Sequence, residues 1–104
     1  MLFYIIGRKR LTNISQNLET AEAAVFISVN ELKKRNILIG DRRTSVTLEP
    51  QVWRILHDVA EMQGCTIHNL CTFINDRKNP KSSLSSAIRV FLMSYLHIQY
   101  RKQK

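Results

Sequence analysis

The sequence is poor in the residue types on which many catalytic sites depend. Its 104 residues include two cysteines, three histidines, three glycines and two prolines. It has no glycine-rich phosphate-binding loop and no pair of carboxylates set in a plausible pocket. We therefore expect neither an enzyme nor a bound cofactor.

Four residues could in principle bind zinc: His57, Cys65, His68 and Cys71. The paired short spacing of a structural zinc site is absent from them. Cys71 also falls on the apolar face of a predicted helix, where a cysteine usually acts as a small buried hydrophobe. The sequence predicts no metal site and two reduced thiols.

Long hydrophobic runs are absent as well. The opening segment MLFYIIG is apolar but far too short to span a bilayer. It lacks the charged start, the long apolar stretch and the cleavage site of a signal peptide. We expect a cytoplasmic, nucleoid-associated protein with no membrane partner.

Acidic residues are few, with 8 Asp and Glu against 16 Lys and Arg. The formal net charge is +8 and the pI is about 10.0. The basic residues cluster at positions 8–10, 33–35, 42–43, 77–81 and 101–104. Such clusters favour a polyanionic partner, with nucleic acid ahead of an anionic membrane surface.

What the sequence does contain is a core, since 44% of its residues are hydrophobic. The length suits one domain with a marginal core, which dimerisation would enlarge. We divide the chain into an N-terminal extension of uncertain structure (1–40), a domain (41–99) and a basic tail (100–104). Within the extension, residues 19–35 fit a helix, although AVFISV also fits a strand. NILIG, at 36–40, fits a short strand or an extended arm.

The segment GDRRTSVTLEP, at 40–50, has the alternation of a strand. Val46 and Leu48 share one face, whereas Arg43, Ser45 and Thr47 share the other. One face is therefore apolar, and the opposite face is basic and rich in hydroxyl groups.

Three helices are predicted after this strand. The first begins at Pro50 and stops at Gly64. The second is capped by Thr66 and carries apolar residues at helical spacing as far as Ile74. A break over residues 76–81 separates it from a third helix, which a serine at 82 or 83 caps. The fold class predicted is mainly α with one short strand.

A single strand leaves its backbone unpaired within one chain, and an exposed edge recruits another strand. The simplest partner is the same strand of a second copy, giving an intertwined homodimer with a two-stranded antiparallel ribbon. Such a ribbon fits the major groove of DNA, where arginine can bind guanine and Ser or Thr can donate or accept. The predicted partners are thus double-stranded DNA and a second copy of the chain.

RTSVTLEPQVWRILHDVAEMQGCTIHNLCTFI resembles the ribbon-helix-helix DNA-binding proteins of the Arc/MetJ/CopG type. IGDRRTSVTLEPQVW, followed by LSSAIRVFLMSYL, resembles a bacterial subgroup with an extra C-terminal helix. The resemblance implies that Arg43, Ser45 and Thr47 face bases. It also implies that the backbone amides around Thr66, with Cys65 and Ile67 beside it, clamp a phosphate.

The remaining candidates follow from charge and apolar spacing. Further phosphate contacts are predicted at Arg42, Arg77, Lys78 and Lys81. The predicted dimer core consists of Val46, Leu48, Val52, Trp53, Leu56, Leu70, Ile74, Ile88 and Phe91.

These features predict a transcriptional regulator, a repressor that binds a short two-fold-symmetric operator. Two alternatives remain open. Residues 1–40 could bind a partner protein, as in antitoxins, or the protein could bind nucleoid DNA or RNA without sequence preference.

Overall fold

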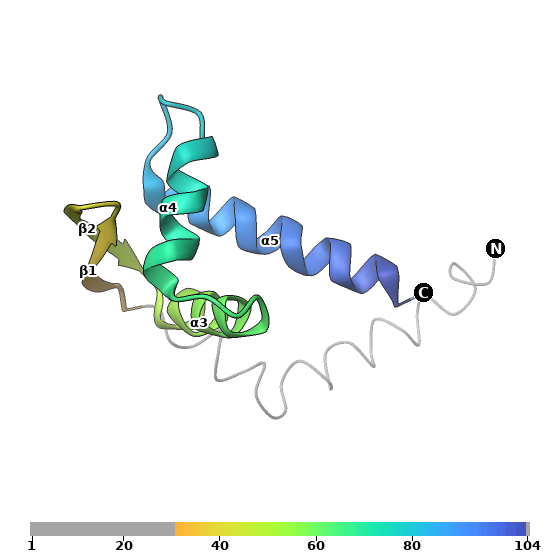
Figure 1. Cartoon of the computed structure of the whole chain (residues 1–104). Coiled ribbons are helices and arrows are strands. Elements are labelled where there is room, and N and C mark those ends of the chain that lie inside the picture. Colours follow the sequence, from red (N-terminus) through yellow and green to blue (C-terminus); the bar gives the residue numbers. More distant parts are fainter. Residues whose placement is uncertain (1–30, 104) are drawn as a thin grey trace. The chain divides into compact units, whose positions relative to one another are not determined.

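The structure, a computed structural model, describes residues 31–103 and consists of a strand hairpin followed by three helices (Figure 1). The strands are β1 (Lys33–Ile39) and β2 (Arg42–Leu48). The helices are α3 (Pro50–Met62), α4 (Ile67–Arg77) and α5 (Leu84–Lys102). Most of the helix predicted over 19–35 lies outside the described residues, and its last three residues belong to β1.

The two strands pair antiparallel within one chain, in a register that places Asn36 opposite Ser45. The two-residue turn between them contains Gly40, whose φ of 62° suits a residue without a Cβ. We call this β1–β2 hairpin the ribbon. The expectation of a single strand is wrong, because β1 of the same chain pairs with one edge of β2. Pairing of β2 with a second copy stays a prediction.

The first strand is fastened to the helices at both of its ends. At its start, the Nε1 of Trp53 in α3 donates to the carbonyl oxygen of Lys33 at 2.9 Å. Near the turn, the amide of Leu38 donates to His68 Nδ1 at 3.0 Å. Thr72 Oγ1 accepts from the Gly40 amide at 3.2 Å, and its one proton is shared between the carbonyl oxygens of His68 at 2.9 Å and Leu38 at 3.3 Å. These bonds give backbone groups of β1 and of the turn partners on α3 and α4.

The helix starts confirm the capping residues read from the sequence. Thr66 Oγ1 accepts from the amide of Asn69 at 3.0 Å, as an N-cap of α4 should. Ser83 Oγ accepts from the amide of Ser86 at 3.1 Å and caps α5 in the same way. Gly64, with a φ of 69°, follows the end of α3. α5 continues through Lys102, so most of the residues assigned to a basic tail lie in its last turn.

The core lies between the inner face of the ribbon and the three helices. The ribbon contributes Ile37, Val46 and Leu48, each at most 1% exposed. The helices contribute a larger set of buried residues: Trp53, Leu56, Val59, Ala60, Leu70, Cys71, Ile74, Ile88 and Leu92. Burying a side chain such as Leu48 stabilises the fold by about 1.5–3 kcal/mol. The ribbon is therefore an integral layer of the domain.

None of the helices in residues 31–103 is long and apolar enough to cross a membrane.

Candidate nucleic-acid interface

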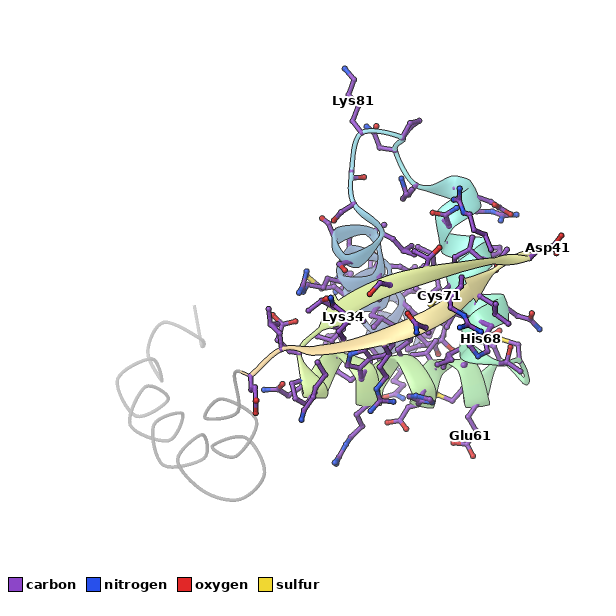
Figure 2. All side chains as sticks on the ribbon, turned by 90° about the vertical axis from the view of Figure 1, so that its left-hand side faces the viewer. Lys34, Asp41, Glu61, His68, Cys71 and Lys81 are labelled. Atoms are coloured by element: carbon purple, nitrogen blue, oxygen red, sulfur yellow. The ribbon has the colours of Figure 1, made fainter. Side chains whose placement is uncertain are left out.

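The ribbon has an outward face that turns away from the helices, and Figure 2 shows the ribbon lying in front of them. The register fixes which side chains share this face, because directly opposite residues point the same way. The cross-strand pairs are Lys34 with Thr47, Asn36 with Ser45, and Leu38 with Arg43. We call these six residues the outward face. They include all three residues that the sequence predicts to contact bases.

Exposure supports this division into two faces. On β2, Arg43 and Ser45 are exposed and Thr47 is half-buried, whereas Val46 and Leu48 are buried. The alternation seen in the sequence is thus realised in the structure.

The ribbon is strongly basic at both ends. Lys33, Lys34 and Arg35 open β1, while Arg42 and Arg43 open β2 just after the turn. Asp41, at the tip in Figure 2, is the one acidic residue of the hairpin. Within residues 31–103 none of these five cations takes part in an ion pair. Their charge is therefore available to a polyanion.

Lys33 and Arg35 at the start of β1 are exposed, although they lie on the same face of the strand as the buried Ile37. Arg35 lies over the ring of Trp53, with its Cζ 5.2 Å from the ring centroid. This cation–π contact covers part of the tryptophan and keeps the guanidinium at the edge of the ribbon.

The end of β2 is held in place by α5. Ser85 Oγ donates to the carbonyl oxygen of Thr47 at 3.1 Å. Beside it, Arg89 donates to Glu49 Oε1 through Nε at 3.0 Å and through Nη2 at 2.9 Å. A hydrogen bond from the backbone of Glu49 and the bonds from Arg89 lower the pKa of the Glu49 carboxyl. The groups are partly exposed, so this pair contributes on the order of 0.5 kcal/mol after solvent screening.

The residues predicted to clamp a phosphate lie at the start of α4. Thr66 is exposed, and the half-buried Cys65 and Ile67 flank it beside an open hollow. A helix N-terminus presents unpaired amides and a partial positive charge, which suits a phosphate. The same hollow is also lined by the Glu61 side chain, whose charge would oppose an anion. Binding of a phosphate here stays a prediction.

The basic residues at the end of α4 and in the loop after it make different contacts. The Arg77 guanidinium lies 3.7 Å from the ring centroid of Phe73 and donates to the carbonyl of Phe73 at 3.3 Å. Lys78 Nζ donates to the carbonyl of Ser82 at 2.8 Å. Lys81 instead extends from the tip of the loop into solvent (Figure 2). Of the three predicted phosphate contacts in this region, Arg77 and Lys81 are exposed and Lys78 is half-buried.

The residues predicted to form a dimer core lie inside one chain. Seven of them are buried there: Val46, Leu48, Trp53, Leu56, Leu70, Ile74 and Ile88. The other two, Val52 and Phe91, are partly buried against the same core. These residues therefore pack together within one chain, and their part in a dimer core stays a prediction.

Sequence reasoning missed the contribution of β1 to the outward face. Lys34, Asn36 and Leu38 are all exposed on it. The missed signal was Gly40-Asp41, a two-residue turn of a type common in hairpins, between NILI and RRTSVTL. In residues 31–103, no three His, Cys, Asp or Glu side chains are grouped so that they could hold a metal ion.

An antiparallel ribbon backed by capped helices, with a basic and polar outward face, defines a small nucleic-acid-binding domain. A family model described as "Ribbon-helix-helix domain" matches residues 32–96, and the chain belongs to this family of DNA-binding transcription regulators. The match confirms the fold predicted from the resemblance and includes β1. Searches of the curated proteins and of the solved structures find no match.

Proposed function

We propose that this protein is a sequence-specific transcriptional repressor of a bacterial cytoplasm that lays its ribbon in the major groove of DNA. The observation that carries the proposal is the outward face of β2. Arg43 and Ser45 are exposed there, and the buried Val46 and Leu48 lie on the opposite face of the same strand. The residues able to read bases are therefore held on a rigid, core-anchored strand.

The dimensions of the ribbon suit the groove. A seven-residue strand is about 20–24 Å long. Two paired strands lie about 5 Å apart, and the major groove is about 12 Å wide. Basic side chains at the two ends of the ribbon can then reach phosphates while its centre meets base edges.

The backbone contacts proposed are those of Arg42, the start of α4 and Lys81. Each would add affinity without sequence preference and would make binding sensitive to salt. Arg42 is next to Arg43 in β2 but lies on the opposite face, which is the inner face of the ribbon. The two neighbouring arginines should therefore play different parts.

A homodimer is the proposed assembly, because ribbon-helix-helix domains typically bind DNA as dimers. Its proposed interface is on α5, where Val90, Met93 and Ile98 are 58%, 67% and 51% exposed. Next to them is an open, mainly apolar hollow of about 420 Å³, lined among others by Phe73, Val90 and Phe91. Exposed apolar surface of this kind marks a contact with another protein.

Selection of bound duplexes from a random pool tests the proposal. The wild-type protein should enrich a defined motif, and a variant with Arg43, Ser45 and Thr47 all replaced by alanine should enrich none. Arg43→Ala alone should weaken binding to the selected motif by roughly 5- to 150-fold, the equivalent of 1–3 kcal/mol, and relax the preference at one position. Retention of the same motif by the triple variant would refute readout by the ribbon.

Arg42→Ala is the matched control, since it removes the same charge from the next residue. It should weaken binding to all sequences alike and reduce the slope of log affinity against log salt by about one. A change of motif in this variant would contradict the assignment of the two arginines.

Sedimentation at micromolar concentration tests the dimer separately. The double substitution Val90→Lys and Met93→Lys should convert a dimer to a folded monomer. A wild-type protein that sediments as a monomer both with and without the selected DNA would exclude the homodimer.

A further inference from the structure

The last of the three base-facing residues of β2 is held by a helix that is distant in the sequence. Ser85, in the first turn of α5, donates its hydroxyl proton to the carbonyl oxygen of Thr47 at 3.1 Å. Arg89, one turn further along α5, binds Oε1 of Glu49, which is the second residue after Thr47. These contacts join positions that are 38 and 40 residues apart. The end of the reading strand is therefore set by α5 as well as by its pairing with β1.

The start of α5 is a firm support for this end of the strand. Ser85 and Arg89 are four positions apart, so they lie on one face of the helix. Ile88, between them, is 0% exposed, and Leu92, one turn after Ile88, is 4% exposed. A shift of α5 relative to β2 would therefore disturb the core as well as these two contacts.

The position of the Thr47 hydroxyl depends closely on the backbone of β2. Threonine is branched at Cβ, which leaves its side chain few rotamers. Recognition of a base edge requires its partners to be placed to within about 0.5 Å. Arg43 lies about 13 Å away along the strand, and its longer side chain can adjust. Contacts at the Thr47 carbonyl should therefore affect what Thr47 reads more than what Arg43 reads.

We propose that Ser85 and Arg89 are positioning residues for base recognition. By holding the end of β2, they place the Thr47 hydroxyl against its base and so set the specificity at one base pair without contacting DNA. This inference rests on the proposed function. A carbonyl oxygen can accept two hydrogen bonds, so the bond from Ser85 is compatible with pairing of β2 to a second copy.

The test compares motifs selected from a random pool by the wild-type protein, Thr47→Ala and Ser85→Ala. The base pair at which Thr47→Ala loses its preference is the one that Thr47 reads. Ser85→Ala should reduce the preference at the same base pair by about 2- to 10-fold, because one hydrogen bond is removed. The preferences that depend on Arg43 should stay. Ser85→Thr retains the hydroxyl and should select the wild-type motif.

Ser86→Ala is the matched control, since it makes the same change at the next position of α5, which is exposed. It should select the wild-type motif. Circular dichroism and thermal unfolding would establish that both alanine variants are folded at the temperature of the assay. A Ser85→Ala variant that binds all sequences more weakly, with its base preferences unchanged, would show a role in stability alone and would overturn the inference.

Exchange of the two charges tests the part of Arg89. Arg89→Glu should reduce the preference at the Thr47 base pair and should also bind all sequences more weakly, because it removes positive charge. Arg89→Glu combined with Glu49→Arg restores the net charge of the wild type and should regain part of that preference. A double variant that selects the same motif as Arg89→Glu would overturn the assignment of Arg89.

Failure of this inference differs from failure of the proposed function. If Thr47→Ala loses a position of the motif but Ser85→Ala keeps every preference, α5 does not position Thr47 and only the inference fails. If Thr47→Ala changes no preference while Arg43→Ala does, Thr47 reads no base, and again only the inference fails. Retention of the motif by the triple alanine variant of β2 would refute the proposed function itself.

Discussion

Trp53 and Lys33, twenty residues apart, are joined by a hydrogen bond of 2.9 Å from the indole Nε1 to the lysine carbonyl oxygen. The tryptophan is 2% exposed, so its polar atom needs a partner within the protein. The bond fastens the first residue of β1 to α3. It is one of the contacts that hold β1 against the helices.

Replacing Trp53 by phenylalanine should loosen this end of β1. The variant loses the donor and part of the buried ring, and we expect a loss of about 1–3 kcal/mol in the free energy of unfolding. Urea denaturation measures the loss, and hydrogen exchange should show faster exchange of the amides of β1. Phe73→Leu, which alters an exposed aromatic side chain on α4, is the control and should change β1 little. Unchanged exchange in Trp53→Phe would show that β1 is held by other contacts.

Thr72 should fasten the opposite end of β1. Its hydroxyl bonds to both the Gly40 amide and the Leu38 carbonyl. Thr72→Val removes these bonds while keeping the shape, and we expect a loss of roughly 0.5–1.5 kcal/mol. Thr72→Ser retains the hydroxyl and should retain most of the stability. Equal stability of the valine and serine variants would contradict a role for the hydroxyl.

The two thiols should differ in reactivity. Cys71 is fully buried, and burial raises the pKa of its thiol to about 11, whereas Cys65 is half-buried. Because the thiolate is the reactive form, a thiol reagent at pH 8 should label Cys65 first. Labelling of Cys71 should follow the rate at which the protein opens. Equally fast labelling of both, read by mass spectrometry, would contradict the buried position of Cys71.

The raised pKa of Cys71 also predicts a dependence of stability on pH. The contribution of the neutral thiol is complete below its ordinary pKa of 9.0 and is lost as the pH rises through about 11. Cys71→Ala should be less stable at neutral pH, but it should show a smaller further decline over this range. Equal declines in both proteins would show that other groups cause the alkaline loss.

The helical part of the fold was predictable because its signals are local. Pro50 and Gly64 mark the ends of the first helix, and Thr66 caps the second, as expected from the sequence. The apolar spacing of β2 likewise predicted which of its residues are buried. These features depend on side chains within a few positions of one another.

The first strand was harder to predict, because long-range contacts stabilise it. ELKKR consists largely of helix formers, and NILI shows no polar alternation. What holds the strand is the burial of Ile37 and the bonds from Trp53, His68 and Thr72, none of which a local pattern contains. NILIG was expected to be a short strand or an extended arm, but the turn at Gly40-Asp41 that joins it to β2 was not recognised. Because this signal was missed, the pairing of β1 with β2 was not predicted.

The most direct test of the central claim, that the ribbon reads the major groove through Arg43, is methylation interference on the selected duplex. Dimethyl sulfate methylates guanine N7 in the major groove and adenine N3 in the minor groove. We predict that N7 methylation of at least one guanine blocks the wild-type protein and that Arg43→Ala loses this sensitivity at one position. Binding that tolerates every N7 methylation, or that only adenine N3 methylation blocks, would contradict the account.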